Sequence, residues 1–278
     1  MGRWIFLMLH ESNKLATFDD MDSQIGTTLS GYSCHDLTGI ANSSLMNRID
    51  SKFLLPVDSL IQVLNACNSY YSLLKIDGVS VFQYDNIYFD TTELNFYNNH
   101  HNRKLNRYKV RHRHYADVGT SYLEVKFKNN KGRTIKNRRI AERDENIALS
   151  SNLDFLKNNG IAQAKSLIAT QKVDYQRISL ANDAQRERLT LDLNINFASI
   201  LEQSKPEDNY TLSNFYIAEL KQEKLDRQSP FYRLMREMSI RSKGFSKYCM
   251  GHALTNNKHI KSNRFKANVI KLNNGANQ

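Results

Sequence analysis

Long cationic side chains recur at every second position in several short stretches, and these residues are the best suited to chemistry. Lys109, Arg111 and Arg113 alternate in this way along one such stretch. Because residues two apart in a strand share a face, each stretch predicts a strand with one charged face. The same alternation groups Glu124, Lys126 and Lys128; Lys136 and Arg138; Tyr175 and Arg177; Arg188, Thr190 and Asp192; and Glu219 and Lys221. Guanidinium groups bind phosphate oxygens in pairs and ammonium groups add point charge, so the pattern predicts chemistry on phosphates.

Six charged strand faces in one chain favour a closed arrangement in which these faces meet. If the sheet closes into a barrel with the charged face inward, it makes a water-filled lumen that repels itself unless a polyanion is bound. The carboxylates on the same faces, Glu124, Asp192 and Glu219, are hard oxygen ligands for a divalent cation that bridges phosphates. Glu124 is equally suited to a structural ion pair with Lys126 or Arg113.

The net charge supports this interpretation because it is local. Residues 103–139 carry 13 Lys and Arg and two acidic residues, which accounts for the whole net charge of +11. A basic surface hairpin that binds nucleic-acid phosphates is the competing interpretation of this segment. The ordered set of charged strands beyond the segment favours the lumen.

Composition predicts a globular, unsecreted protein. The 278 residues are 40% hydrophobic and include only 11 Gly and 3 Pro, which excludes collagen-like and linker compositions. Cys34, Cys67 and Cys249 are far apart without a C-x-x-C motif, so neither a disulfide framework nor a zinc knuckle is expected. The apolar run Trp4 to Leu9 is too short for a membrane helix or a signal-peptide core. We expect a cytoplasmic protein with no membrane span.

The patterning predicts an α+β fold with an antiparallel eight-stranded β tunnel and flanking helices. We expect strands at residues 47–54, 81–89, 106–115, 121–128, 133–140, 173–180, 186–197 and 215–222. Apolar residues at three-and-four spacing predict helices over residues 55–74 and 142–170, and Ser229-Pro230 begins another. We divide the chain into a loosely packed lead-in, residues 1–45, a tunnel domain, residues 46–255, and a frayed basic tail, residues 256–278.

A series of motifs in a fixed order resembles the VTC domain, the polyphosphate polymerase domain within the CYTH-like triphosphate tunnel superfamily. The motifs are RIDSKF near residue 50, YFDTTELNFY at 88–97, KVRHRHY at 109–115, YLEVK at 122–126, YQR at 175–177, RLTLD at 188–192, AELK at 218–221 and FSKYCMG at 245–251. The resemblance covers about residues 46 to 251. It implies a tunnel that binds ATP and polyphosphate with Mn²⁺ or Mg²⁺ and moves the γ-phosphate of ATP onto a growing polyphosphate chain.

The resemblance also assigns residues. Arg111, Arg113, Arg177 and Lys126 are the expected catalytic residues. The candidate substrate ligands are Lys52, Arg48, Lys136, Arg138, Tyr175, Arg188, Lys221 and Lys247. Glu219 is the expected metal ligand with Glu124 as a second candidate, and Arg188 and Asp192 are expected to form a supporting pair. The superfamily often has E-x-E-x-K in its first strand, whereas residues 48–52 read RIDSK, which favours a polymerase over a hydrolase.

Three hypotheses follow. The first is an ATP-dependent polyphosphate polymerase. The second is a metal-dependent triphosphatase of the same fold, which a missed second metal carboxylate would favour. The third is a non-catalytic module that binds polyphosphate or nucleic acid, although no nucleic acid is expected. A separate membrane protein that takes up the product is an open question. We expect Arg177→Ala to abolish product formation and leave the fold intact.

Overall fold

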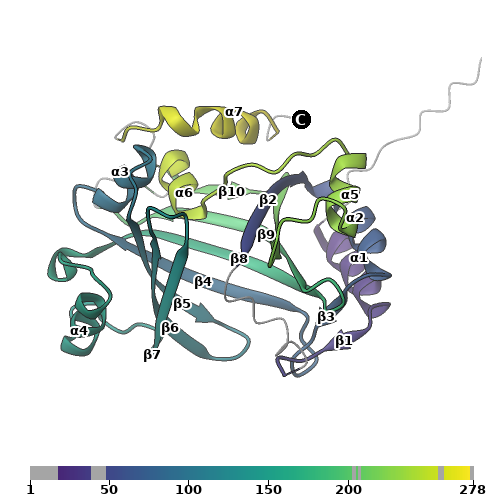
Figure 1. The fold of residues 1–278 in the computed structure, drawn as a ribbon, viewed down its shortest axis with the longest axis horizontal. Coiled ribbons are helices and arrows are strands. Elements are labelled where there is room, and N and C mark those ends of the chain that lie inside the picture. Colours follow the sequence, from purple (N-terminus) through teal and green to yellow (C-terminus); the bar gives the residue numbers. More distant parts are fainter. Residues whose placement is uncertain (1–17, 39–47, 202–204, 206–207, 256–259, 276–278) are drawn as a thin grey trace, which may run out of the picture.

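A strongly curved antiparallel sheet forms the centre of the computed structural model, which describes residues 18–38, 48–201, 205, 208–255 and 260–275 (Figure 1). The main strands follow one another in the hydrogen-bonded order β2-β11-β9-β8-β4-β5-β6-β7. Their bounds are β2 Ile49–Pro56, β4 Val81–Asp90, β5 Arg107–Tyr115, β6 Thr120–Lys128, β7 Thr134–Ala141, β8 Ile168–Asn182, β9 Glu187–Ser199 and β11 Phe215–Gln222. The predicted fold class is confirmed, and every strand predicted from alternation is present.

The sheet is larger than predicted and is not a closed barrel. Three short strands, β1 Cys34–His35, β3 Ser72–Leu74 and β10 Tyr210–Leu212, extend it. Among the described residues, no pairing joins the end strands β2 and β7. The backbone N–H of Lys243 donates to the carbonyl oxygen of Lys52 at 2.8 Å, so another segment contacts the free edge of β2. Alternation predicts which residues share a face, but it carries no information on whether the end strands meet.

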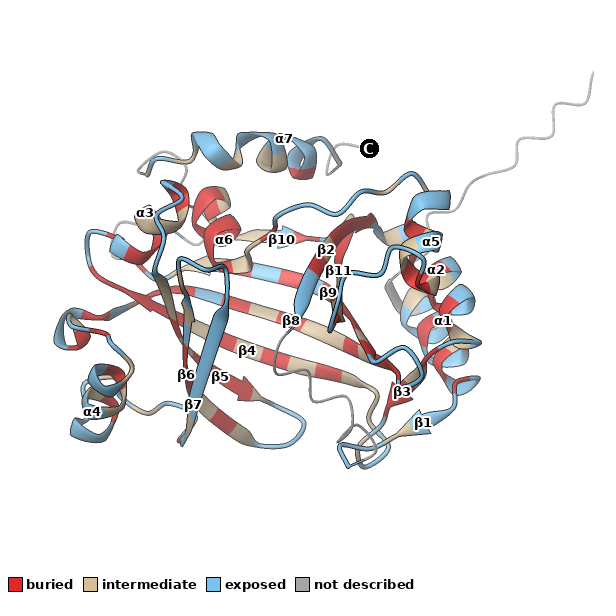
Figure 2. Ribbon diagram, viewed as in Figure 1, coloured by how far each residue is buried: buried red, intermediate tan, exposed pale blue. Residues whose placement is uncertain are grey.

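Three helices cover the convex face of β2, β8, β9 and β11 (Figures 1 and 2). These are α1 Phe18–Ser30, α2 Leu60–Asn68, which follows the 3₁₀ turn η2 Val57–Ser59, and α5 Pro230–Glu237. Ser229 precedes α5 and Pro230 occupies its first turn, as the sequence predicted. The core beneath these helices includes the buried side chains Phe53, Leu64, Ile178, Leu191 and Phe231. Since these residues fill the convex side, the residues that alternate with them face the concave side.

A second group of helices lies around one end of the sheet and beside β7. Helices α3 Asn95–His101, α6 Lys247–Thr255 and α7 Lys266–Gly275, which follows η5 Asn263–Phe265, gather at one end (Figure 1). Helix α4 Ser150–Asn158 is followed by η3 Ala164–Ser166. Arg139 of β7 donates hydrogen bonds to Glu145 and to Asn152 of α4. The helix therefore lies against the side of β7 that faces away from the concavity.

Several predicted boundaries are wrong. Residues 18–38 of the expected lead-in form α1 and β1, and Ile25, Leu29 and Tyr32 are buried. The helix predicted over residues 55–74 ends at Asn68, because Leu73 then pairs with Leu180 of β8. Residues 1–17 and 39–45 of the lead-in lie outside the described residues.

The other helix predictions fail at their ends as well. Only Ser150–Asn158 of residues 142–170 is α-helical, and Gly160, with φ of 81°, follows its end. Helix α7 lies within the expected frayed tail, and its Leu272 packs into the core, while residues 256–259 and 276–278 are outside the described residues. No helix in the described part of the chain is both long and apolar enough to cross a membrane.

Candidate active site: a cationic concave face

The side chains predicted to share charged faces occupy adjacent positions on the concave side of the sheet. Strand pairing places these residues opposite one another: Arg111 and Glu124, Lys109 and Lys126, Lys126 and Lys136, Arg177 and Asp192, Glu219 and Lys52, and Lys221 and Arg188. Opposite residues in a sheet have their side chains on the same face and within reach of each other. The structure therefore brings together predicted site residues from seven strands.

Asp192 holds two of the cations in place. It is fully buried, and Arg177 donates two hydrogen bonds to it, from Nε to Oδ1 at 2.6 Å and from Nη2 to Oδ2 at 2.9 Å. The ammonium group of Lys247 binds the same carboxylate. Burial alone would raise the pKa of Asp192, but the charges of Arg177 and Lys247 hold it below its ordinary value. The carboxylate is therefore ionised and orients both cations.

The predicted pair of Arg188 and Asp192 needs correction. Asp192 binds Arg177 and Lys247. The charges that act on Arg188 are those of Arg48 and Asp183, at the other end of the same strand face. Sequence alternation placed Arg188 on the correct face but could not show which neighbouring strand supplies the partner of each carboxylate.

Glu124 is a structural ion-pair partner in this state. Its side chain is 2% exposed, Oε2 accepts from Arg111 at 2.7 Å and 2.6 Å, and Lys136 binds Oε1. Burial opposes ionisation, but the charges of Arg111, Arg113 and Lys136 hold the pKa of Glu124 below its ordinary value. Both carboxylate oxygens lie against protein cations and the side chain is closed to solvent, so Glu124 fits an ion-pair anchor better than a metal ligand, whereas the side chain of Glu219 is 14% exposed.

Glu219 is the more accessible carboxylate and lies on the opposite wall. Lys52 binds Oε2, and the Nζ of Lys221 is 3.6 Å from Oε1. Burial by itself would raise the pKa of Glu219, but Lys221 and Lys52 hold it well below its ordinary value. The result is a permanently charged oxygen ligand that faces the cations of β6 across the concavity.

Arg113 and Lys126 have no carboxylate within ion-pair distance among the described residues. Arg113 is 5% exposed, and its Nε and Nη2 donate to Asn86 at 2.8 Å and to the hydroxyl of Tyr175 at 2.7 Å. A buried cation held only by neutral groups is unfavourable unless an anion is supplied. Lys126 is exposed to solvent within the concavity. These two residues are the clearest sites for an external anion.

Tyrosine rings pack against the guanidinium groups of Arg113 and Arg177. The Cζ of Arg113 lies 4.9 Å from the centre of the Tyr84 ring, and that of Arg177 lies 4.8 Å from the same ring. Tyr84 stacks on Tyr175 with 5.3 Å between the ring centres. Such cation–π contacts fix the plane of a guanidinium without consuming its hydrogen-bond donors. The Nη1 groups of Arg113 and Arg177 have no partner in the described part of the chain and remain available to a ligand.

The crowding of positive charge changes the lysine pKa values. Lys126 still contacts solvent, but loss of hydration and the charge of Lys109 lower its pKa to about 8. Loss of hydration also lowers the pKa of Lys136 to about 8, against the opposing effect of Glu124, and the charge of Arg111 adds to the lowering. A bound polyanion would remove this penalty, so the site is electrostatically prepared for one.

The buried carboxylate of Asp90 connects two of the sequence motifs, YFDTTELNFY at 88–97 and FSKYCMG at 245–251. This fully buried carboxylate accepts the backbone N–H groups of Phe96 and Tyr97 at 2.8 Å and 2.9 Å, which caps the first turn of α3. The hydroxyl of Tyr248 in α6 also donates to Asp90. Because Lys247 precedes Tyr248, this contact helps to place Lys247 at Asp192. The Nζ of Lys109 donates to Ser246 at 2.9 Å and adds a second attachment.

Sequence reasoning missed several inner-face residues. Tyr84, Asn86 and Tyr88 lie on the concave side of β4 and orient Arg113, Arg177 and Arg111. Their signal was present, because they alternate with Gln83, Asp85 and Ile87, but they are uncharged and were not singled out.

Asp50 was also missed as an inner-face carboxylate. It lies opposite Lys221 in the β2–β11 pair, and its Oδ1 accepts from Arg48 at 3.0 Å. Arg48 and Asp50 are both partly exposed, at one end of the charged face. Two-residue alternation from Lys52 back along β2 could have placed both of them there.

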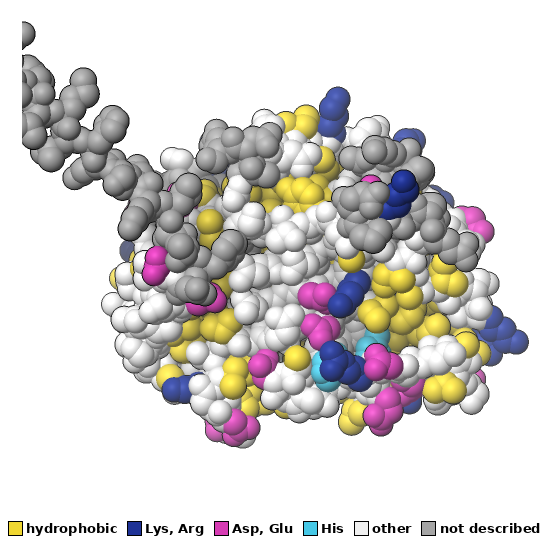
Figure 3. Space-filling model, turned by 180° about the vertical axis from the view of Figure 1, so that it is seen from behind, with side chains coloured by type: hydrophobic (Ala, Val, Ile, Leu, Met, Phe, Trp, Pro, Cys, Tyr) yellow, Lys and Arg dark blue, Asp and Glu magenta, His cyan; other side chains and the backbone are white. Residues whose placement is uncertain are grey.

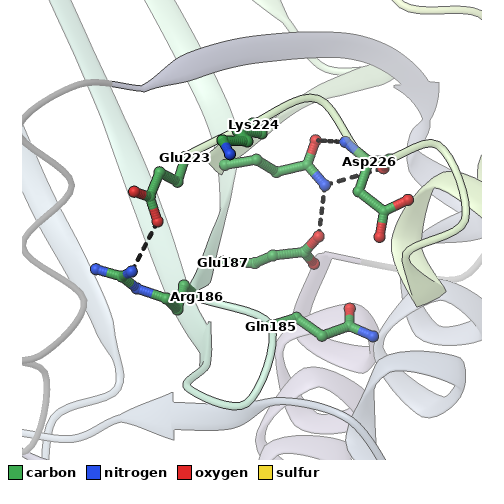
Figure 4. Close-up of a pocket in the computed structure, with 7 residues that line it drawn as sticks. Gln185, Arg186, Glu187, Glu223, Lys224 and Asp226 are labelled. Atoms are coloured by element: carbon green, nitrogen blue, oxygen red, sulfur yellow. Dashed lines mark hydrogen bonds and ion pairs between the residues drawn. The ribbon is translucent and has the colours of Figure 1, made fainter.

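Two other parts of the surface do not show the same concentration of positive charge. Seen from behind, the molecule carries scattered charges of both signs (Figure 3). A hollow beside the β8–β9 turn is lined by Gln185, Arg186, Glu187, Gln222, Glu223, Lys224 and Asp226 (Figure 4). There Arg186 pairs with Glu223 at 2.8 Å, and Gln222 and Tyr71 donate to Glu187. This hollow has no excess of cations and is not a phosphate site.

A divalent cation fits one side of the concave face. No group of three or more His, Cys, Asp or Glu side chains that could hold a metal occurs in the described ranges. Mg²⁺ commonly binds through one or two carboxylates, with water and substrate phosphates as its other ligands. The ionised Glu219 meets that requirement, and Asp50 lies one residue pair away along the same face.

One family model and several solved structures are similar to this chain. Among solved structures, a presumed adenylate cyclase from Bacillus halodurans is similar with a TM-score of 0.47 and 15% identity, covering 72% of this chain and 94% of that chain. A presumed adenylyl cyclase from Hippeastrum, reported to have a dominant triphosphatase activity, has a TM-score of 0.48 and 15% identity, covering 74% of this chain and 95% of that chain. Comparison with curated proteins gives no match. Residues 47–256 match the family model of the VTC domain, and the chain belongs to that family.

Proposed function

We propose that this protein is a polyphosphate polymerase that transfers the γ-phosphate of ATP to a growing inorganic polyphosphate chain on the concave face. The observation that carries the proposal is the surplus of inner-face cations, above all Arg113 and Lys126, which form no ion pair with a carboxylate in the described part of the chain. Membership of the VTC domain family supports a function on phosphates. Such a local surplus of positive charge favours binding of an anion.

The length of the cationic face supports a ligand longer than one triphosphate. The inner residues of β6 run from Tyr122 to Lys128, and strand geometry makes this roughly 20 Å. Cations of the neighbouring strands accompany them: Arg113 lies opposite Tyr122, Arg111 opposite Glu124 and Lys109 opposite Lys126. A chain of phosphates can bind along this row in successive registers, as a polymerase requires.

Positioning and charge neutralisation carry most of phosphoryl transfer. In the proposal, Arg111, Arg113 and Arg177 hold the transferring phosphate. Arg113 and Arg177 present Nη1, while their other nitrogens are fixed by Asn86, Tyr175 and Asp192.

The remaining ligands flank this centre. Lys52, Lys126 and Lys247 contact the neighbouring phosphates, with Lys136, Lys221, Arg188 and Arg48 toward the ends of the row. A divalent ion, Mn²⁺ or Mg²⁺, would be held by Glu219 and would neutralise phosphate charge.

A triphosphatase is the second candidate, and one observation favours it. Asp50 lies on the inner face, opposite Lys221 and next to the pair of Glu219 and Lys52. A second carboxylate is therefore available close to Glu219. A hydrolase that uses two carboxylates would need Asp50, whereas the proposed polymerase does not.

The test is to incubate the protein with ATP, Mn²⁺ and a short polyphosphate primer and to separate the products on a polyacrylamide gel. The proposal expects a ladder of lengthened chains from the wild type and from Asp50→Asn, and none from Glu219→Gln. Orthophosphate release that disappears in Asp50→Asn would instead establish the triphosphatase. A shifted primer without turnover would indicate a binding module and refute both enzymes.

A further inference from the structure

One part of the concave face is not suited to phosphate. Tyr122 of β6 lies directly opposite Ile140 of β7, so both side chains share the inner face. The Cζ of Arg138 lies 4.5 Å from the centre of the Tyr122 ring, which places the guanidinium over the ring. Ile140 is 70% exposed and Arg138 is exposed. The three residues form a small apolar and aromatic lip beside the row of cations.

This lip needs an explanation that polyphosphate does not provide. Inorganic phosphate chains have no apolar part, and exposed isoleucine gains nothing from contact with them. A nucleobase is flat, has a π-face, and stacks on tyrosine rings and on arginine guanidinium planes. Ile140 could cover the edge of such a base. The guanidinium of Arg138 already lies over the Tyr122 ring, and a base would extend this stack.

The lip is also in the correct place for a nucleoside triphosphate. Tyr122 lies opposite Arg113 on β5, and the next inner residues of β6 are Glu124 and Lys126, at steps of about 6.6 Å. A base at Tyr122 would therefore direct its triphosphate along the strand toward Arg113, Arg111 and Lys126. The base of a nucleoside triphosphate would thus lie at Tyr122, and its phosphates would lie at the cations.

We propose that Tyr122, Arg138 and Ile140 form the nucleobase subsite of the phosphate donor and distinguish a nucleoside triphosphate from inorganic triphosphate. This inference rests on the proposed function in taking a nucleoside triphosphate as the donor. It is tested by binding and not by turnover, so that the two can fail separately.

The experiment measures the affinity of two probes by isothermal titration calorimetry with Mg²⁺: the non-hydrolysable β,γ-imido analogue of ATP, and inorganic tripolyphosphate. The variants are Ile140→Ser and Tyr122→Ser/Ile140→Ser. The control is Ile135→Ser, which changes an isoleucine of the same strand that is 50% exposed on the opposite face.

We expect the double variant to bind the ATP analogue about tenfold more weakly, since stacking of a base on an aromatic side chain contributes about that much or more. Its affinity for tripolyphosphate, and both affinities of Ile135→Ser, should stay unchanged. Should the double variant fail to fold, the exposed site of Ile140→Ser still permits the comparison, with a smaller loss confined to the ATP analogue. Equal losses for both probes, or no loss for either, would overturn the subsite. Absence of polymerisation with this selectivity intact would refute the polymerase and leave the subsite standing.

Discussion

The buried pair of Arg177 and Asp192 argues against the expectation that Arg177→Ala leaves the fold intact. We now expect this variant to damage the fold as well as the site, because Arg177 neutralises a carboxylate that water does not reach. Asp192 is 0% exposed and Arg177 is 13% exposed, and two hydrogen bonds of 2.6 Å and 2.9 Å join them. Removal of the guanidinium leaves Lys247 as the one remaining cation on Asp192 among the described residues. Removing one partner of a buried pair typically costs about 3–5 kcal/mol, so we expect a loss of this size.

The matched variant is Arg177→Ala/Asp192→Asn. It removes both charges, keeps a polar group for Lys247, and leaves no buried carboxylate without its partner. We expect it to regain about 2 kcal/mol or more relative to Arg177→Ala, which would appear as a coupling energy in a double-mutant cycle. The assay is urea unfolding followed by circular dichroism, with the slope compared among variants to check that the same surface is exposed.

The pH dependence gives an independent check. The pKa of Asp192 is held below its ordinary value, so its contribution to stability is present above the unfolded-state pKa of 3.8 and is lost as pH falls through the folded value. Without Arg177 the folded pKa rises, and acid unfolding should begin at higher pH. If Arg177→Ala is within 1 kcal/mol of wild type and the double variant is no more stable, the argument that Asp192 depends on Arg177 is refuted.

Three further predictions concern the cations and the packing behind them. Lys126→Ala should weaken tripolyphosphate binding about tenfold or more in calorimetry. Its melting temperature should be unchanged or raised, because a repelling charge is removed. The control variant Lys172→Ala, on the opposite face, should leave binding unchanged. Because Lys126 and Lys136 have pKa values of about 8, both lose their positive charge as pH rises from 7 to 9. Tripolyphosphate affinity should therefore fall over this range, by up to about one log unit per pH unit for each lysine. An affinity independent of pH would contradict this. Gly251→Ala should destabilise by about 1–3 kcal/mol in urea unfolding, since its Cβ would lie 2.9 Å from the Phe197 ring, and an unchanged midpoint would show that α6 can shift.

The strands and their charged faces could be predicted because alternation is a local property with a fixed period. Lys109, Arg111 and Arg113 reach the same face whatever the strand pairs with, and burial of the opposite side then fixes which face is concave. The helix ends could not be predicted in this way. Residues 168–170 belong to the predicted helix, but β8 begins at Ile168 because it pairs with Asp90 of β4, a partner far away in sequence.

The partners of the carboxylates were beyond sequence reasoning for a related reason. Asp192 could be expected to face the cations, yet its choice of Arg177 and Lys247 depends on strand order and on how Tyr248 attaches α6 to Asp90. These contacts decide which cations are occupied by the protein itself. They separate Arg177, which is anchored to a carboxylate, from Arg113, which is anchored by neutral groups alone.

This separation changes how the site should be tested. Variants of Arg177, Arg111 or Lys52 each disturb an ion pair with Asp192, Glu124 or Glu219, so lost activity in them would combine a contact with a ligand and a defect in the fold. Lys126 has no carboxylate within ion-pair distance in the described ranges, so its removal takes away positive charge and little else. The most informative residue for function is therefore not the best-ordered cation of the site, but Lys126, which forms no ion pair with a carboxylate in the described part of the chain.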